Sequence, residues 1–208
     1  ITSVKTGERR KNPQPPFTTS NLQQEAVRKL SFTTKKTMQI AQMLYEGVDI
    51  EGEGTVGLIS YIRTDSTRLS DEALTAARDY ISANFAPEYL PETPNIYKGR
   101  KNAQDAHEAI RPTHALFSPE KVKASLTRDQ YRLYKLIYDR YLASQMTPAV
   151  YDTLAVELGS GEAQFRFGGM KKKFAGFTVL YEESQDEPAE KESNLPKVQV
   201  GDQVTMKE

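Results

Sequence analysis

Residues 57–65 read GLISYIRTD and bring together side chains that could act on a phosphate. The apolar and β-branched run over 56–62 predicts a short buried strand. Alternate residues of a strand share one side, so Ile59, Tyr61, Arg63 and Asp65 are expected to lie together. A phenol beside a guanidinium suits phosphodiester transesterification, because the phenol oxygen can attack phosphorus while the guanidinium stabilises the non-bridging oxygens.

This pair has an ordinary structural alternative. A free phenol ionises only near pH ~10, so such a nucleophile needs a positive field, a base or a metal ion. Taken alone, a Tyr-x-Arg pair on a strand is more often a buried tyrosine beside an ion pair. The residues that follow, Asp65, Ser66 and Thr67, could cap the next helix or hydrogen-bond a phosphate.

A second polar cluster lies in QDAHEAIRPT, residues 104–113. We expect a short helix over 103–110 that ends at Pro112. His107 and Arg111 are four residues apart and would share one face of it, with Asp105 and Glu108 close enough to hold either one. The pair could bind a phosphate or move a proton. A cluster of ion pairs that caps the helix is the alternative.

The composition restricts the classes of site. The chain has no cysteine, which excludes disulfides, thiolate zinc sites and cysteine nucleophiles, and its two histidines argue against a histidine metal site. Basic and acidic residues balance at 28 each, so any surface for nucleic acid has to be local. The acidic stretch over 182–192 is typical of a solvated loop. No apolar run is long enough to span a bilayer, so a cytoplasmic location is expected.

The remaining sequence predicts the helices and strands that position these residues. Prolines keep residues 1–20 extended. Capping boxes predict that one helix begins at Ser20, with Gln23, and another at Thr127, with Gln130. Further helices are expected from Thr34 to Gly47, and beginning at Ser70 and at Ser118–Pro119. The tyrosines of that last helix fall on its apolar stripe, which favours a place in the core.

The hydrophobic period changes at Pro148. TLAVEL, AQFRF, FTVLY and KVQV each predict a strand. We therefore expect an α+β protein in which a mainly helical domain, residues 21–146, is inserted in a discontinuous β-rich domain. The lead-in 1–20 and the tail 147–208 would form the β-rich part.

The two polar clusters together are similar to a known family. GLISYIRTDST followed by AHEAIRPT resembles the bacterial type IA DNA topoisomerases. PPFTTSNLQQEA, KKTMQIAQMLYEG and SQMTPAVYDT resemble them as well, so the resemblance covers nearly the whole chain and weakens over 158–208. Ile62, Glu108 and Arg111 favour the topoisomerase I branch over the topoisomerase III type, whose motifs look like YPRTDS and AHHAI.

The resemblance implies a role for each matching residue. Tyr61 would be the nucleophile that forms a transient 5′-phosphotyrosine with single-stranded DNA, and Arg63 would position the scissile phosphate. His107 and Arg111 would contact the DNA backbone near the cleavage point. Asp65, Ser66 and Thr67 belong to the same signature. Negatively supercoiled DNA would be relaxed by passing a strand through the gap, without ATP.

The resemblance also implies what lies elsewhere. The family's Mg²⁺ ligands belong to a Toprim domain, and nothing like that domain is present here, so this chain is expected to be the tyrosine-bearing fragment of a monomeric, cytoplasmic, nucleoid-associated enzyme. Its helical domain would be mobile and its β-rich domain part of an arch. A C-terminal domain is also expected to be missing. The alternative is a non-catalytic gate or clamp that holds single-stranded DNA, with Tyr61 stacked on a base.

Overall fold

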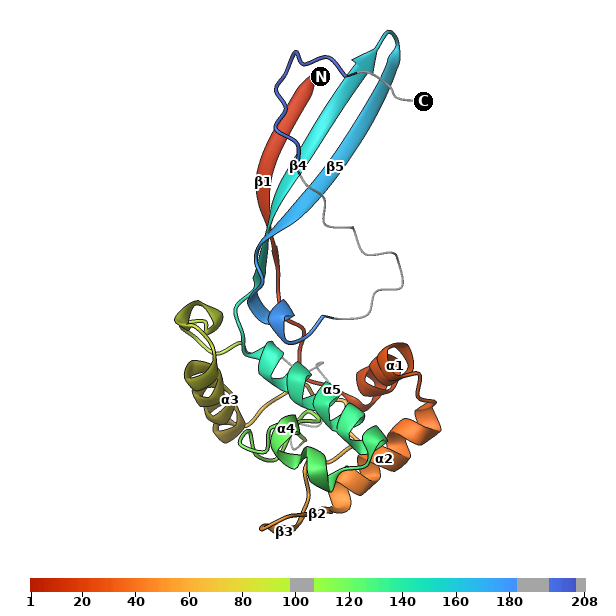
Figure 1. Cartoon of the computed structure of the whole chain (residues 1–208), viewed down its shortest axis with the longest axis vertical. Coiled ribbons are helices and arrows are strands. Elements are labelled where there is room, and N and C mark those ends of the chain that lie inside the picture. The colour runs from red at the N-terminus through yellow and green to blue at the C-terminus, as the bar shows by residue number, and fades with distance from the viewer. Residues whose placement is uncertain (98–106, 183–194, 205–208) are drawn as a thin grey trace. The chain divides into compact units, whose positions relative to one another are not determined.

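The computed structural model describes residues 1–97, 107–182 and 195–204, and its fold is α+β. The chain forms two units, which we describe separately. The first contains Ile1–Asn12, Pro148–Gly176 and residues 195–204, and the second contains Pro13–Thr147 and residues 177–182. The elements are β1 Ser3–Lys11, α1 Thr19–Leu30, α2 Thr34–Glu46, β2 Val48–Ile50, β3 Gly54–Val56, α3 Asp71–Asn84, η1 Pro87–Tyr89, α4 Pro119–Val122, η2 Lys123–Ser125, α5 Arg128–Ser144, β4 Ala149–Ser160, β5 Ala163–Phe174 and η3 Gly176–Val179 (Figure 1).

The second unit is organised around α5. The expected capping box is confirmed, since the Thr127 side chain accepts from the Gln130 backbone and the Gln130 side chain accepts from Thr127 N–H. Of the tyrosines expected in the core, Tyr131 is only half-buried. Tyr134 and Tyr141 lie in the core as expected, at 0% and 1% exposed. Their hydroxyls donate to the carbonyls of Phe117 and Ala73, each over 2.6 Å, so these buried polar groups are satisfied.

The helices around α5 begin close to the positions that the sequence predicts. α2 ends at Gly47, which takes a positive φ of 130° at the helix terminus. Ser70 caps α3 by accepting from Ala73 N–H over 3.3 Å. The predicted capping box of the first helix is wrong. Thr18 is the N-cap and accepts from Asn21 N–H, so the helix begins before Ser20.

The first unit is an antiparallel sheet with the strand order β1-β4-β5. β1 pairs with β4 from Ser3↔Glu157 to Lys11↔Ala149. The two strands predicted over FTVLY and KVQV are not formed. FTVLY instead becomes η3 and the residues after it, and Phe177 and Tyr181, 2% and 4% exposed, are buried within the second unit.

A buried polar cluster holds the entering and returning segments of the second unit on its helices. Arg140 of α5 is 1% exposed and donates from Nε to the carbonyl of Pro15 over 2.7 Å. Its guanidinium carbon lies 4.9 Å and 5.0 Å from the ring centroids of Phe17 and Tyr181. The Tyr181 hydroxyl donates to Oε2 of buried Glu25 over 2.6 Å. Residues 13–17 and 177–181 therefore belong with the helices, although the sequence-based boundaries placed both in the β-rich part.

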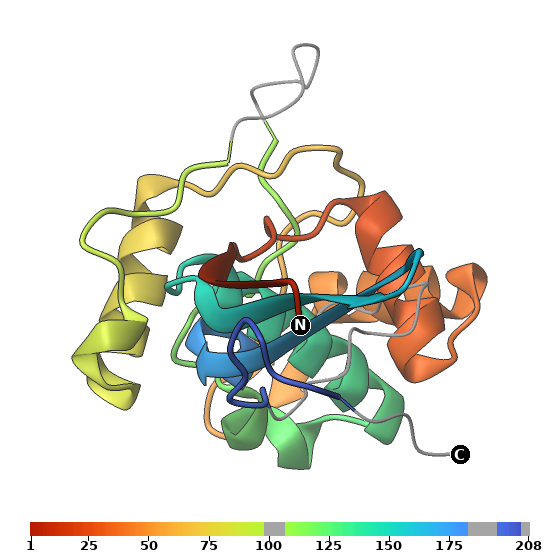
Figure 2. The ribbon, with the colours of Figure 1, turned by 90° about the horizontal axis from the view of Figure 1, so that it is seen from above.

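Within the second unit, α3 lies on one side, α1 and α2 lie on the other, and the extended segment that follows β3 crosses between them (Figure 2). None of the described helices is long and apolar enough to cross a membrane.

Candidate functional site

The segment 57–70 is irregular, with a bend at residues 62–63, and does not form the predicted strand over 56–62. Strand β3 ends at Val56, and the backbone groups after it bond to several different elements. Leu58 N–H donates to Leu44 O at the end of α2 over 2.8 Å. Ser60 N–H donates to Arg111 O over 2.9 Å, and Ile59 and Pro112 form an isolated bridge. The hydrogen bonds that a ladder would supply therefore come from a helix end and a neighbouring loop.

The alternation of side chains holds for part of the expected set. Tyr61, Arg63 and Asp65 are exposed, whereas Ile62 and Thr64 are 2% and 7% exposed. Ile59 departs from the prediction, since it is buried at 1%. The side that faces solvent therefore begins after Ile59, at Tyr61.

Helix α1 holds the segment in this orientation. The Thr19 hydroxyl donates to Ile62 O over 2.7 Å and accepts from Thr64 N–H over 2.9 Å. Thr19 N–H donates to Thr64 O over 2.9 Å. These contacts hold the backbone of Ile62 and Thr64 on α1, and Tyr61 and Arg63 are left exposed.

The second polar cluster is not helical where the structure describes it. Residues 107–110 have no regular secondary structure apart from an isolated bridge at Ile110. Ala109 N–H donates to Arg68 O and Ile110 N–H to Phe17 O, each over 2.8 Å. The rest of the predicted helix, including Asp105, lies outside the described residues. His107 and Arg111 therefore do not share a helix face, and the two side chains have different surroundings.

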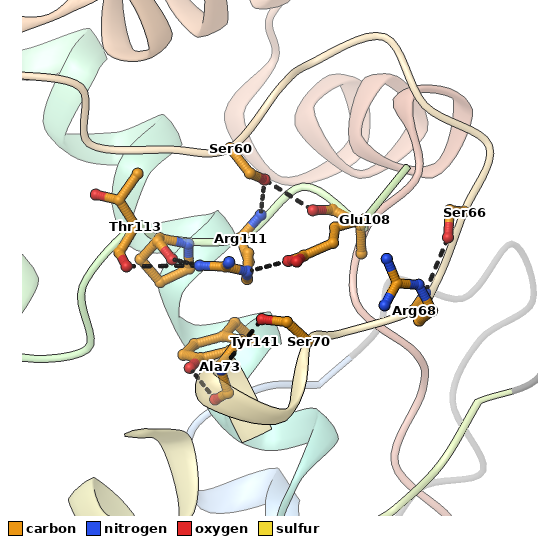
Figure 3. A network of polar contacts seen from close by, with 11 residues as sticks. Ser60, Ser66, Arg68, Ser70, Ala73, Glu108, Arg111, Thr113 and Tyr141 are labelled. Carbon is orange, nitrogen blue, oxygen red and sulfur yellow. Dashed lines mark hydrogen bonds and ion pairs between the residues drawn. The ribbon is translucent and has the colours of Figure 1, made fainter. Parts of the chain in front are cut away.

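Arg111 is engaged inside the protein. Its Nε donates to Glu108 Oε2 over 2.6 Å, and a terminal nitrogen donates to Pro112 O over 3.0 Å (Figure 3). The Arg111 and Glu108 side chains are 17% and 24% exposed. Ser60 completes the network by accepting from Arg111 N–H over 3.0 Å and donating to Ala109 O over 2.7 Å. The network therefore joins residues 57–60 to residues 108–113.

The electrostatics of Glu108 match this arrangement. Burial raises the pKa of the Glu108 carboxyl, but the hydrogen bond and charge of Arg111, with smaller contributions from Ser70 and Arg68, outweigh burial and leave the pKa below its usual value. The carboxylate form is therefore the one that the fold stabilises.

Tyr61 lies against two other rings. Its ring centroid is 5.7 Å from that of Tyr45, edge to face at 67°, and 5.9 Å from that of His107, tilted by 37°. Tyr61 is 44% exposed, and its hydroxyl makes no hydrogen bond with any described residue. The hydroxyl is therefore open to a ligand, while the ring is held by aromatic contacts.

An open hollow of about 540 Å³ lies between the motif and the start of α1. It is lined by Thr18, Thr19, Ser20, Arg63, Thr64, Asp65 and His107. Tyr61 is not among its described lining residues, but its ring contacts that of His107, which does line it. Arg63 makes no hydrogen bond or ion pair with any described residue. The hollow also borders the start of α1, where backbone N–H groups and the helix dipole favour an anion. A guanidinium, an imidazole and a helix N-terminus suit a phosphate, with Asp65 as the opposing charge.

The other predicted site residues, Ser66, Thr67 and Arg111, are not among the described residues that line this hollow. Ser66 is 3% exposed, and its hydroxyl accepts from Arg68 N–H over 3.2 Å while its own N–H donates to the Thr64 hydroxyl over 3.0 Å. Thr67 is half-buried. A second hollow, about 660 Å³, is lined by Arg111 and Tyr141 but by neither Tyr61 nor Arg63. Ser66 thus shapes the backbone, and Arg111 borders a different hollow from Arg63.

Sequence reasoning missed residues 18–20 and Tyr45. The first were taken as the extended lead-in and the start of a helix, although hydroxyl residues before a helix are also common at anion sites. Tyr45 is the last residue of the apolar stripe of α2, and no pattern in the neighbouring sequence predicts its contact with Tyr61.

The described residues contain no group of three or more His, Cys, Asp or Glu side chains that could hold a metal ion. Asp65 alone in the hollow does not make a Mg²⁺ site, since this ion is usually bound through several oxygen ligands. The residues described here therefore do not fit a magnesium centre.

The chain is similar to known proteins both in sequence and in fold. A family model described as DNA topoisomerase matches residues 1–208. The structure of full-length topoisomerase I from Thermotoga maritima is similar over 93% of this chain, with a TM-score of 0.76 and 40% sequence identity. The chain spans 31% of the length of that protein.

Proposed function

This chain belongs to the family of bacterial DNA topoisomerases, and we propose that it carries the strand-cleaving tyrosine of a type IA enzyme. The observation that carries the proposal is the exposed Tyr61, whose ring contacts His107, a residue that lines a hollow together with Arg63. In this proposal a single DNA strand lies across the hollow, with a phosphate near Arg63.

The proposed reaction exchanges one phosphodiester for another. The Tyr61 oxygen attacks phosphorus and loses its proton to a base, for which the adjoining His107 is the candidate. The bond from phosphorus to the 3′ oxygen breaks, and that oxygen takes up a proton to become a 3′-hydroxyl. The product is a 5′-phosphotyrosine. Attack by the 3′-hydroxyl reverses each step, so the strand is resealed without a nucleotide cofactor.

Arg63 would stabilise the charge on the non-bridging oxygens in the transition state. Its guanidinium is exposed and has no described partner, so it is free to bind a phosphate through two N–H groups. The N-terminal turn of α1 would add to the positive potential of the same hollow.

Arg111 would act differently from the role that the family resemblance implies. Its side chain is bonded to Glu108 and to backbone carbonyls, which supports a role in holding residues 107–113 in place. In this proposal His107 contacts the DNA and Arg111 fixes the segment that carries it.

The rest of the reaction would need the remainder of the enzyme. Magnesium in type IA enzymes would be held by the Toprim domain, and no step proposed here passes through the ion. The second unit would be the part that moves with the cleaved strand, and the sheet of the first unit would belong to the arch. Relaxation of negatively supercoiled DNA would follow from passing a strand through the opened gap.

The decisive experiment is Tyr61→Phe in the complete enzyme. We expect loss of the covalent protein–DNA adduct with a labelled single strand, because the attacking oxygen is gone, while DNA binding remains. Tyr131→Phe is the matched control, because it removes a tyrosine hydroxyl that is exposed on α5 and bonded to Glu120, far along the chain from the motif. This variant should form the adduct normally. Adduct formation by Tyr61→Phe would disprove the proposed nucleophile.

A non-catalytic clamp for single-stranded DNA is the second candidate function. The exposed rings of Tyr45 and Tyr61 favour it, because nucleobases stack on such rings. If the chain is a clamp, the complete enzyme forms no covalent adduct at position 61. Tyr61→Ala then weakens DNA binding, whereas Tyr61→Phe does not.

A further inference from the structure

The end of α2 is joined directly to the segment that carries Tyr61. Leu58 N–H donates over 2.8 Å to the carbonyl of Leu44, in the last turn of the helix. Gly57 lies so close to the helix that an added Cβ would be 2.7 Å from Tyr45 O. The backbone of the loop is therefore seated on the helix terminus, and this contact brings the side chain of Tyr45 to Tyr61.

The contact between the two tyrosines has a defined geometry. The rings meet edge to face at 67°, with centroids 5.7 Å apart, which is a favoured arrangement of aromatic pairs. Tyr45 is 39% exposed, so its ring is not needed to fill the core. The contact with Tyr61 is the principal described interaction of this side chain.

Tyr61 depends on such contacts for its orientation. Its hydroxyl has no hydrogen bond to a described residue, and the side chain is 44% exposed. An unrestrained aromatic side chain on an extended backbone can occupy more than one staggered rotamer. The rings of Tyr45 and His107 restrict that choice, and the reaction of a nucleophile depends steeply on its position.

We propose that Tyr45 is a positioning residue that holds the Tyr61 phenol in the orientation from which it attacks the phosphate. This inference rests on the proposed function of Tyr61. Tyr45 acts through its ring, and its hydroxyl takes no part, since no described residue bonds to it.

The test measures single-turnover cleavage of a labelled single strand by the complete enzyme at saturating DNA, with DNA affinity measured separately. Tyr45→Ala should slow cleavage about two- to tenfold, the loss that corresponds to one edge-to-face contact, and leave the affinity unchanged. Tyr45→Phe keeps the ring and should restore the rate. Tyr45→Leu keeps apolar bulk without the ring and should remain slow, which guards against a result caused by poor folding.

Met43→Ala is the matched control. Met43 is 52% exposed on the same helix end and makes no described ring contact with Tyr61, so its removal should leave the rate unchanged. An unchanged rate for Tyr45→Ala, or a loss of DNA affinity that accounts for the whole defect, would overturn the inference. Failure of the proposed function is distinguishable, since it appears as adduct formation by Tyr61→Phe.

Discussion

At the scale of single residues, the motif side chains fall into two groups. Tyr61, Arg63 and Asp65 are exposed, and the latter two line the hollow, whereas Ser66 is buried and Arg111 is held in a network. An exposed cation without a partner can bind a ligand at little cost. A cation that already bonds a carboxylate and two carbonyls would first have to break those contacts. Arg111 is therefore better suited to holding the site than to binding DNA.

Glu108→Gln tests the network at this scale. We expect a loss of about 1–2 kcal/mol in unfolding free energy at pH 7, because the charged hydrogen bond to Arg111 is weakened. The fold lowers the pKa of Glu108, so its contribution is present above the pKa of the unfolded chain, about 4.3, and disappears as the pH falls through the folded value.

Urea unfolding of this chain at several pH values checks the prediction. The difference between wild type and Glu108→Gln should shrink below about pH 4, where the wild-type carboxyl becomes protonated. Glu53→Gln, in the exposed turn between β2 and β3, should change the unfolding free energy by less than about 0.5 kcal/mol at every pH. A difference for Glu108→Gln that stays constant down to pH ~3 would contradict the assigned electrostatics.

At the scale of elements, the site depends on how segments meet α1 and α2. Thr19 holds the backbone of residues 62–64, and the end of α2 holds Gly57 and Leu58. The carbonyls at a helix C-terminus have no partner within the helix, so a passing N–H group satisfies one of them. The loop therefore takes a fixed course without being a strand.

Gly57→Ala tests the seating of this loop on α2. The new Cβ would lie 2.7 Å from the backbone oxygen of Tyr45, and a backbone atom cannot move aside as a side-chain tip can. We expect a loss of about 1–3 kcal/mol in unfolding free energy, measured by chemical denaturation. Gly168→Ala in β5 is the matched control, since its Cβ would meet nothing within 4 Å. Equal stability of the two variants would show that the close approach carries no strain.

At the scale of the whole molecule, two separate stretches of the chain complete the helical unit. The chain enters the helical unit once at residues 13–17 and returns to it at residues 177–181, and Arg140 with Glu25 and Tyr181 binds both segments to the helices. Each segment is therefore fixed within the helical unit itself.

We expect the chain by itself to bind single-stranded DNA weakly and to relax no supercoiled plasmid in the presence of Mg²⁺. The physical reason is that the described residues offer no metal site, and the chain spans 31% of the length of a full-length relative. A gel-based relaxation assay checks this, with the complete enzyme as the positive control. Magnesium-dependent relaxation by the purified chain would show that the reaction needs less of the enzyme than we propose.

The sequence alone determined the local features of this protein. The capping box at Thr127, the end of α2 at Gly47 and the burial of three of the four tyrosines on the stripe of α5 were predicted correctly, because each depends on residues within a few positions of one another. The shared side of Tyr61, Arg63 and Asp65 was also predicted from the alternation of side chains, although the same pattern wrongly placed Ile59 with them. The similarity of the two motifs to a known family was visible for the same local reason.

Only the tertiary structure decided which distant segments meet. Residues 57–62 fail to form a strand because their N–H groups bond to Leu44 and Arg111, which no local pattern reveals. Arg111 turns toward Glu108 and away from the hollow, and Tyr45 comes to Tyr61 only because Gly57 is seated on α2. These choices depend on contacts between residues far apart in the chain, whose energies are set by packing in the folded state.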